Sequence, residues 1–189
     1  MGHPVGNMPA VPSQVKITLK DGRELLLRGA ERDDIPWLGG IYARVYDPAN
    51  FDVGETWTPK TATQTLEDLD GKDPSLSLVA EMDGRIVGGI LGGTKRWQGK
   101  NVLEIKEVFV NPGFQQRGIG KELMKECLHR ARVFDKVKDI ELVTFADRGH
   151  ARFWYGELGF RPAEGLQTMY AKADEITNSL SPRSSAEGE

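Results

Sequence analysis

The sequence has little cysteine and no long apolar run. Only one of its 189 residues is cysteine, Cys127. A single thiol excludes a disulfide within the chain, so we expect a reducing compartment. Cys127 stands among the apolar residues of a predicted helix, a setting typical of a buried structural thiol. No apolar run reaches the roughly 18–20 residues of a membrane span, so we predict no membrane partner.

Strong charge of one sign is also missing. The formal net charge is −3 with histidine neutral, so no large positive field favours nucleic acid. The N-terminus lacks a basic region followed by an apolar stretch, and we therefore expect no signal peptide and a cytoplasmic location. The three histidines show no metal-ligand spacing with Cys, Asp or Glu, so no metal site is predicted.

The composition predicts one domain between two polar ends. Residues 1–14 and 174–189 lack periodicity and are rich in Gly, Pro, Asn or Ser, and we expect both to be disordered. Residues 15–173 contain no internal repeat and fit a single domain. Hydrophobic periodicity there predicts the order β-α-α-β-β-β-α-β-α-β-β, which is typical of a mixed α/β sheet.

The individual elements follow from periodicity and turn residues. Residues 15–20 and 23–28 form either a hairpin or one strand with a lead-in. The clearest hairpin surrounds Asp83-Gly84, a tight-turn pair. Asp33 or Asp34 is expected to cap the first helix. The other predicted strands are 101–110, 138–145, one that begins at Phe160, and 167–172. Helices are expected at about 35–45, 60–69, from the glycine-rich stretch to 133, and at 148–158, where Gly159 ends the helix.

One stretch combines a strand, three glycines and a helix. It is EVFVNPGFQQRGIGKELM, with Gly113, Gly118 and Gly120 where a helix should begin. Glycine is a poor helix former, so its presence needs a reason. A helix N-terminus carries unpaired N–H groups and a partial positive charge, and glycines allow close approach of a phosphate.

Two interpretations of this stretch stay open on the glycines alone. Arg117 and Lys121 agree with a phosphorylated ligand, but glycines can also simply make a tight connection. The spacing matches neither a Walker loop nor the GxGxxG fingerprint.

The fuller pattern is more specific. Val110-x-Pro112-x-x-Gln115-Gln116-Arg117-Gly118-Ile119-Gly120 resembles motif A of the GNAT superfamily of acyl-CoA-dependent N-acyltransferases. Downstream, Ala151-x-Phe153-Trp154-Tyr155-x-x-Leu158-Gly159-Phe160 is similar to the closing motif of that family. The resemblance covers roughly residues 23–172. It implies an α/β (α+β) fold with a mixed, mostly antiparallel sheet of six to seven strands, about four helices and a splayed central strand pair.

The resemblance also implies an acetyl-CoA site. Backbone N–H groups of the loop would hold the pyrophosphate, and the edge of strand 104–110 would pair with the pantetheine arm. Two positions depart from the family pattern, since many members have Gly at Gln116 and Asn at Arg148. The implied cofactor-binding residues are Phe109, Val110, Gln115, Gln116, Arg117, Gly118, Ile119, Gly120 and Lys121.

Acyl transfer to an amine calls for a general base, an N–H donor for the oxyanion and a general acid. The resemblance implies Tyr155 as the acid, although a core aromatic is the alternative, and a backbone N–H near Val110 as the donor. The base is Glu104, Glu107 or neither. Strand alternation puts these two glutamates on opposite faces unless a bulge intervenes.

The acceptor side is less defined by sequence. The loop 47–60 holds Asp47, Asp52, Glu55 and Trp57, which suit a cationic amine or simply a solvated loop. The run GGILGG at 88–93 indicates a backbone packed close to the acceptor or to a neighbouring strand.

These observations predict an acetyl-CoA-dependent N-acetyltransferase that works by direct transfer in a ternary complex. A small amine is the favoured acceptor, with a protein lysine or N-terminus second, and a homodimer stays open. A non-catalytic acyl-CoA-binding or regulatory module on the same fold is the main alternative. A phosphate-binding domain unrelated to CoA is a third.

Overall fold

The structure is a computed structural model that describes residues 12–48, 56–70, 73–145 and 149–165. The chain divides into two compact units, residues 1–143 and 144–189. In the described residues, the first unit contains a six-stranded sheet with three α-helices, and the second contains one α-helix. None of the described helices has the length and apolar composition needed to cross a membrane.

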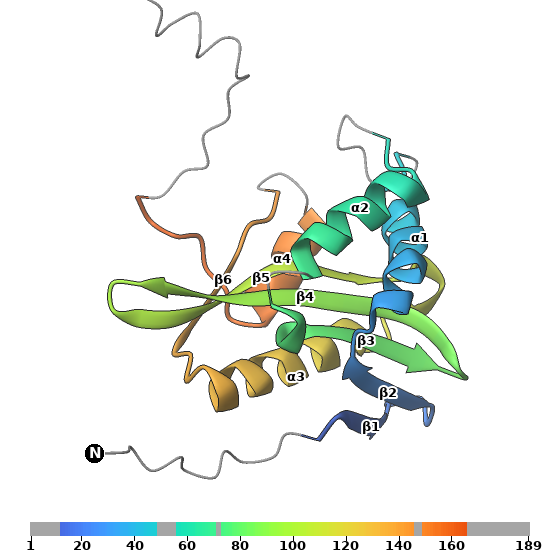
Figure 1. Cartoon of the computed structure of the whole chain (residues 1–189), viewed down its shortest axis with the longest axis horizontal. Coiled ribbons are helices and arrows are strands. Elements are labelled where there is room, and N and C mark those ends of the chain that lie inside the picture. Colours follow the sequence, from blue (N-terminus) through green and yellow to red (C-terminus); the bar gives the residue numbers. More distant parts are fainter. Residues whose placement is uncertain (1–11, 49–55, 71–72, 146–148, 166–189) are drawn as a thin grey trace, which may run out of the picture. The chain divides into compact units, whose positions relative to one another are not determined.

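The sheet of the first unit follows the chain in the order β1-β2-β3-β4-β5-β6. Every neighbouring pair is antiparallel except β5 and β6, which are parallel (Figure 1). The strands are β1 Gln14–Thr18, β2 Glu24–Gly29, β3 Ser77–Met82, β4 Arg85–Trp97, β5 Lys100–Val110 and β6 Asp139–Leu142. The expected mixed, mostly antiparallel sheet is confirmed, and β1 with β2 is a hairpin.

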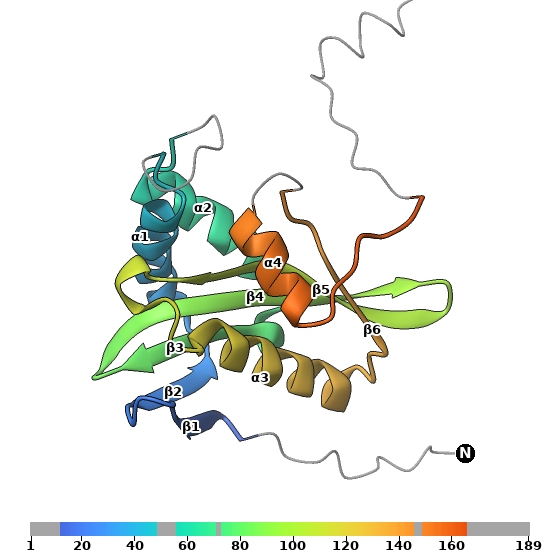
Figure 2. The same cartoon turned by 180° about the vertical axis from the view of Figure 1, so that it is seen from behind.

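Helices cover both faces of this sheet (Figures 1 and 2). A Cβ on Gly89 would contact Leu38, whereas a Cβ on Gly92 would contact Cys127. Positions three apart on a strand face opposite ways, so the helix of Leu38 and the helix of Cys127 lie on opposite faces. These helices are α1 Ile35–Val45, which packs with α2 Pro59–Asp70, and α3 Ile119–Phe134.

Close backbone approach explains the glycine run of β4. A Cβ on Gly88 would lie 2.6 Å from the carbonyl oxygen of Phe109 on β5. The space that a Cβ on Gly89 would need is filled by Leu38 of one helix, and the space that a Cβ on Gly92 would need is filled by Cys127 of the other. The run is therefore shaped by the neighbouring strand and by both helix layers.

Cys127 lies fully buried under the sheet. Its Sγ donates to the carbonyl oxygen of Leu76 at 3.6 Å, and burial raises the pKa of the thiol to about 12. A thiol in this state is a poor nucleophile, so the predicted structural role is confirmed.

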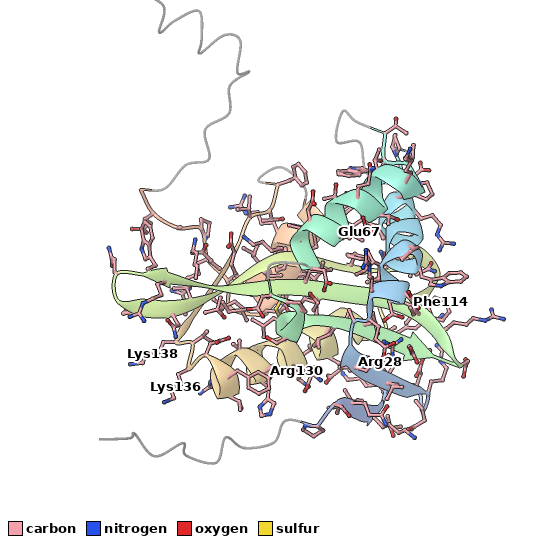
Figure 3. All side chains as sticks on the ribbon, in the orientation of Figure 1. Arg28, Glu67, Phe114, Arg130, Lys136 and Lys138 are labelled. Atoms are coloured by element: carbon pink, nitrogen blue, oxygen red, sulfur yellow. The ribbon has the colours of Figure 1, made fainter. Side chains whose placement is uncertain are left out.

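Two arginines tie the start of the unit together (Figure 3). Arg28 of β2 pairs with Asp34 at 2.6 Å and with Glu81 of β3 at 2.5 Å. Arg130 of α3 pairs with Glu126 at 2.8 Å and donates to the carbonyl oxygen of Pro12 at 3.3 Å. The contacts of Arg28 with Glu81 and of Arg130 with Pro12 join segments far apart in the sequence, whereas those with Asp34 and Glu126 are local.

Several predicted boundaries differ from the observed ones. Asp34 does precede α1, but its carboxylate accepts from Arg28 and from the backbone N–H of Glu31 rather than capping α1. The expected strand 138–145 is shortened to β6.

The strand expected to begin at Phe160 is wrong, because residues 160–163 have no regular structure. The N–H of Phe160 donates to Tyr155 at 3.0 Å and so closes the preceding helix. Pro162 adds a position that has no N–H to offer to a sheet. The strand predicted at 167–172 lies outside the described residues.

The second unit contains α4, Gly149–Glu157, which agrees with the predicted helix. Gly159 follows it at φ +95° and donates to Gly156 at 2.9 Å. The left-handed conformation is the one glycine adopts at the end of a helix.

Candidate active site

The pairing of β5 changes along its length. β6 pairs with the segment Val102–Ile105, so among the described strands β4 is the one neighbour of residues 106–110. The N–H of Asn111 donates to Val87 of β4 at 2.8 Å. Since successive residues of a strand point to alternate edges, the N–H of Val110 points to the edge that β6 has left. This is the edge expected to receive a pantetheine arm, and it lies open to another strand-like ligand.

The loop after β5 is held by its own side chains. Asn111 accepts from the N–H of Gly113 at 3.3 Å, and Gln115 Nε2 donates to the carbonyl oxygen of Val110 at 3.0 Å. Arg117 donates to Gly113 at 3.1 Å. Its guanidinium carbon lies 5.3 Å from the ring centre of Phe114, which marks this loop in Figure 3. The side chains of Gln115 and Arg117 therefore shape the loop.

The backbone N–H groups of the same loop are left without acceptors. Gln116 has φ +61° and Gly118 has φ +87°, so two left-handed residues flank Arg117. Such alternation turns successive N–H groups towards one concave side. Within the described residues, no hydrogen bond uses the N–H groups from 116 to 121. The first turn of α3 adds a partial positive charge, so the loop fits a pyrophosphate.

Gln116 departs from the family pattern in a physically informative way. A left-handed φ favours glycine, and a residue with a Cβ adopts it at some cost in free energy. Gln116 nevertheless takes that conformation. The loop thus has at Gln116 a backbone conformation that glycine would adopt at lower cost.

A bulge separates the two candidate base residues on β5. Leu91 of β4 pairs with Glu107, but the next residue, Gly92, pairs with Ile105. Lys106 is therefore an extra residue on β5. A bulge of this kind shifts the alternation of side chains by one position.

The shift brings Glu104 and Glu107 to the same face of the sheet. Their partners on β4 are Gly93 and Leu91, which are two residues apart and so face the same way. Simple alternation would put the two glutamates on opposite faces of the sheet. The prediction allowed for a bulge, and the bulge at Lys106 puts them on the same face. Both glutamates lie on the face covered by α1, since Leu91 belongs to the core cluster of that helix.

Glu107 lies in an aromatic setting. Tyr42 donates to one carboxylate oxygen at 3.0 Å and Tyr46 to the other at 3.3 Å. The ring of Tyr42 meets Phe109 edge-on at 5.2 Å and Trp57 edge-on at 5.1 Å. Burial raises the pKa of Glu107 to about 7, against the lowering effect of the two hydroxyls. A carboxylate with such a pKa can both accept and release a proton near neutral pH.

Glu104 has a different environment. It forms an ion pair with Lys106, and about a quarter of each side chain is exposed. The carboxylate of Glu104 is thus already paired with a cation of its own strand. Glu107 is therefore the better placed candidate for proton transfer.

Sequence reasoning missed Tyr42 and Tyr46. They are four residues apart, at the end of α1, and so share one helix face. That spacing is visible in the sequence, but their contact with Glu107 joins residues more than 60 positions apart. Trp57 was singled out and does join this group, whereas Asp47 is exposed. Asp52, Glu55 and Arg148 lie outside the described residues.

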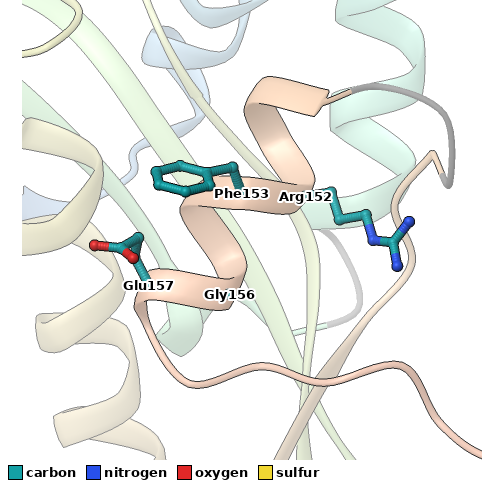
Figure 4. A pocket seen from close by; sticks show the side chains of 4 residues that line it. All are labelled: Arg152, Phe153, Gly156 and Glu157. Carbon is teal, nitrogen blue, oxygen red and sulfur yellow. The ribbon is translucent and has the colours of Figure 1, made fainter.

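Tyr155 belongs to the second unit. Its ring lies 4.9 Å from that of Trp154 and 5.7 Å from that of Phe160. A hollow of about 430 Å³ opens on the same helix, lined by Arg152, Phe153, Gly156 and Glu157 (Figure 4). Tyr155 is not one of its lining residues. The hollow therefore adds nothing to the assignment of an acid.

Comparison with known proteins decides the family. Residues 42–160 match the acetyltransferase (GNAT) family. The chain belongs to the GNAT family. The predicted family and the acetyltransferase class are thus confirmed, and the GNAT family uses acyl-CoA.

Two curated relatives are named as N-acetyltransferases. An uncharacterised N-acetyltransferase of Archaeoglobus fulgidus is 28% identical over 151 residues, which cover 78% of this chain and 90% of the relative. One of Methanocaldococcus jannaschii is 28% identical over 142 residues, which cover 73% of this chain and 61% of the relative. The chain thus spans about three fifths of the length of the second relative.

Solved structures share the fold. A possible acetyltransferase from Clostridium difficile has a TM-score of 0.64 at 16% identity, covering 78% of this chain and 97% of that one. An aminoglycoside N-acetyltransferase in complex with CoA has a TM-score of 0.61 at 19% identity, covering 80% and 97%. At this identity the likeness concerns the fold.

Proposed function

We propose that this GNAT protein transfers an acetyl group from acetyl-CoA to a small primary amine, by direct transfer in a ternary complex. The observation that carries the proposal is the loop whose N–H groups from 116 to 121 lack acceptors, next to the open edge of β5. The similar fold of an aminoglycoside N-acetyltransferase in complex with CoA supports it. A protein lysine or N-terminus is the second choice of acceptor.

Residues of this chain would hold acetyl-CoA in two ways. The N–H groups of Gln116 to Lys121 would bind the pyrophosphate, and Lys121, which is exposed, would add a positive charge nearby. Val110 would help to bind the pantetheine arm at this edge of β5, as an added strand would be bound. The backbone of Phe109 points to β4, because Phe109 lies two residues before Asn111. The bound thioester supplies the acetyl group and a thiol leaving group.

Glu107 is the proposed general base. An amine with a lysine-like pKa of about 10.4 is protonated at neutral pH and must lose a proton before it attacks. Glu107 would accept that proton while Tyr42 and Tyr46 keep both carboxylate oxygens in place. The N–H of Val110 would donate to the oxyanion that develops on the acetyl carbonyl.

Tyr155 is the proposed general acid, on the strength of the closing motif. Its hydroxyl would give a proton to the leaving thiolate. After the attack, the nitrogen would lose a second proton, a proton from solvent would restore the Tyr155 hydroxyl, and Glu107 would release its proton to solvent. One N–C bond would then be formed, one C–S bond broken, and one proton released overall.

The first test is calorimetric titration of the pure protein with acetyl-CoA, with ATP as the control ligand. We expect micromolar binding of acetyl-CoA and far weaker binding of ATP. Amine-dependent thiol release then measures transfer. Equal binding of both ligands would favour a general phosphate site, and acetyl-CoA binding without turnover of any amine would favour a non-catalytic module.

Two substitutions separate binding from chemistry. Gly120→Glu should abolish acetyl-CoA binding, because it puts a bulky anion beside the acceptor-free N–H groups. Tyr155→Phe should keep the affinity and lower the rate by roughly 10²-fold or more. An unchanged rate in Tyr155→Phe would remove this residue from the mechanism.

A further inference from the structure

We propose that Glu107, Tyr42, Tyr46, Trp57 and Phe109 form the binding site for the acceptor's ammonium group, and that the acceptor is an alkyl or arylalkyl amine with no carboxylate beside the amine. We call this group of five residues the aromatic carboxylate site. The inference rests on the proposed function and names the substrate class for it.

Glu107 is a buried carboxylate without a cationic partner among the described residues. Glu107 has hydrogen bonds to two hydroxyls, but it forms no ion pair with any Lys, Arg or His among the described residues. A buried carboxylate without a cation is costly in free energy. By contrast, Glu104, Glu81 and Glu126 each have a cationic partner. A substrate ammonium would provide the partner that Glu107 lacks.

The second argument is the aromatic surroundings. Tyr42 is 4% exposed and Phe109 is 3% exposed, so both rings are buried beneath the site. Tyr46 and Trp57 are partly buried and pack against the same cluster, so they are the members of the site that would contact a ligand. Aromatic faces attract cations, with Trp the strongest, and the effect grows when water is excluded.

The C-terminal end of α1 also contributes to the electrostatic field at the aromatic carboxylate site. The helix ends at Val45, and its last turn carries Tyr42. The carboxyl end of a helix has a partial negative charge, which stabilises a nearby cation. Glu107, the aromatic faces and the helix end therefore all favour a positive group.

The same features disfavour an amino acid. A carboxylate beside the amine would be brought close to Glu107, and none of the five residues can offer it a positive charge. Apolar substituents, in contrast, match the aromatic surroundings. The chemistry of the site thus favours an ammonium on a hydrocarbon chain or ring.

The test measures binding by calorimetry, with the full chain and saturating CoA so that no transfer occurs. The matched ligands are 2-phenylethylamine and phenylalanine, which differ by one carboxylate. The variants are Glu107→Gln and Trp57→Leu. Trp37→Leu is the control, since Trp37 is 71% exposed on α1 and is not part of the site.

We expect 2-phenylethylamine to bind at least roughly thirtyfold more tightly than phenylalanine and to lose a similar factor in Glu107→Gln. Trp57→Leu should weaken binding roughly two- to thirtyfold, and Trp37→Leu should leave it unchanged. A circular dichroism spectrum like that of the unmodified protein shows that each variant is folded. Trp57→Phe, which keeps an aromatic face, should lie between Trp57→Leu and the unmodified protein.

Three results would overturn the inference: equal affinity for the two ligands, unchanged affinity in Glu107→Gln, or no binding of the amine at millimolar concentration. Each leaves the proposed function standing if acetyl-CoA still binds and another amine is acetylated. Loss of acetyl-CoA binding in the unmodified protein would instead reject the proposed function. The two failures are therefore distinguishable.

Discussion

The two halves of β5 differ, although they are continuous in one strand. The half before the bulge at Lys106 pairs with both β4 and β6, and its Glu104 forms an ion pair with Lys106. The half after the bulge has β4 as its one strand neighbour in the part of the chain that the structure describes, and its Glu107 accepts hydrogen bonds from Tyr42 and Tyr46 at the end of α1. Glu104 and Glu107 thus lie on the same face of β5 but in different electrostatic environments.

The surroundings of a carboxylate decide whether it can exchange a proton near neutral pH. Glu104 is paired with Lys106 and partly exposed. Glu107 forms no ion pair among the residues that the structure describes, and burial raises its pKa to about 7. A group of this kind can take up a proton at neutral pH and release it again. The contrast between the two glutamates can be tested by changing each in turn.

The largest expected effect is on the rate of transfer. Glu107→Gln should lower kcat by roughly 10²–10⁴-fold, because the loss of a general base typically costs that much. Glu104→Gln should change kcat by less than about threefold, because an ion pair near the surface contributes little. Steady-state kinetics with acetyl-CoA and a common amine measure both variants.

The matched pair excludes a general effect of charge on the sheet. Both variants remove one negative charge from the same face of β5, and only the surroundings differ. A larger loss in Glu104→Gln than in Glu107→Gln would reverse the assignment of the base. Similar large losses in both would indicate that the two carboxylates act together.

Local signals predicted much of this fold from the sequence. Asp83-Gly84 adopts left-handed φ values of 50° and 69°, as a tight hairpin requires. The helices α1 to α3 begin and end close to their expected positions. The glycine-rich loop was recognised because its backbone conformation restricts the residue types it accepts.

The parts that sequence did not predict depend on long-range packing. Nothing in the residue type of Lys106 marks it as a bulge, since the extra residue is defined only by the register with β4. The contact of Tyr42 with Glu107 likewise arises only when α1 packs on the sheet. The strand expected at Phe160 does not form, because the N–H of Phe160 donates to the carbonyl oxygen of Tyr155 and closes the preceding helix.

A smaller effect is expected on stability as a function of pH. The pKa of Glu107 is raised from 4.5 to about 7 in the folded state, so folding favours the protonated form. The free energy of unfolding therefore falls as the pH rises from about 4.5 to 7, by about 3 kcal/mol at most. Glu107→Gln removes this loss. Its melting temperature should exceed that of the unmodified protein by several degrees at pH 8.5, and by little at pH 5.

Thermal unfolding at a series of pH values measures this difference. Glu104→Gln is again the control, and its melting temperature should follow the unmodified protein across the same range. A constant difference between Glu107→Gln and the unmodified protein at every pH would show that the charge of Glu107 does not limit stability.

The smallest expected effect concerns the tyrosines that distinguish the second half of β5 from the first. Tyr46→Phe removes a hydroxyl that donates to Glu107 at 3.3 Å and so lowers the pKa of the carboxyl group. Without this donor the pKa of Glu107 should rise, because hydrogen bonds to a carboxylate favour its charged form. The acidic limb of the profile of kcat/KM against pH should then move upward from about 7 by a fraction of a unit, while the rate at pH 9 stays close to that of the unmodified protein. A purely structural role for Tyr46 would instead lower the rate equally at every pH, so the position of the limb, rather than the rate at one pH, decides between the two roles.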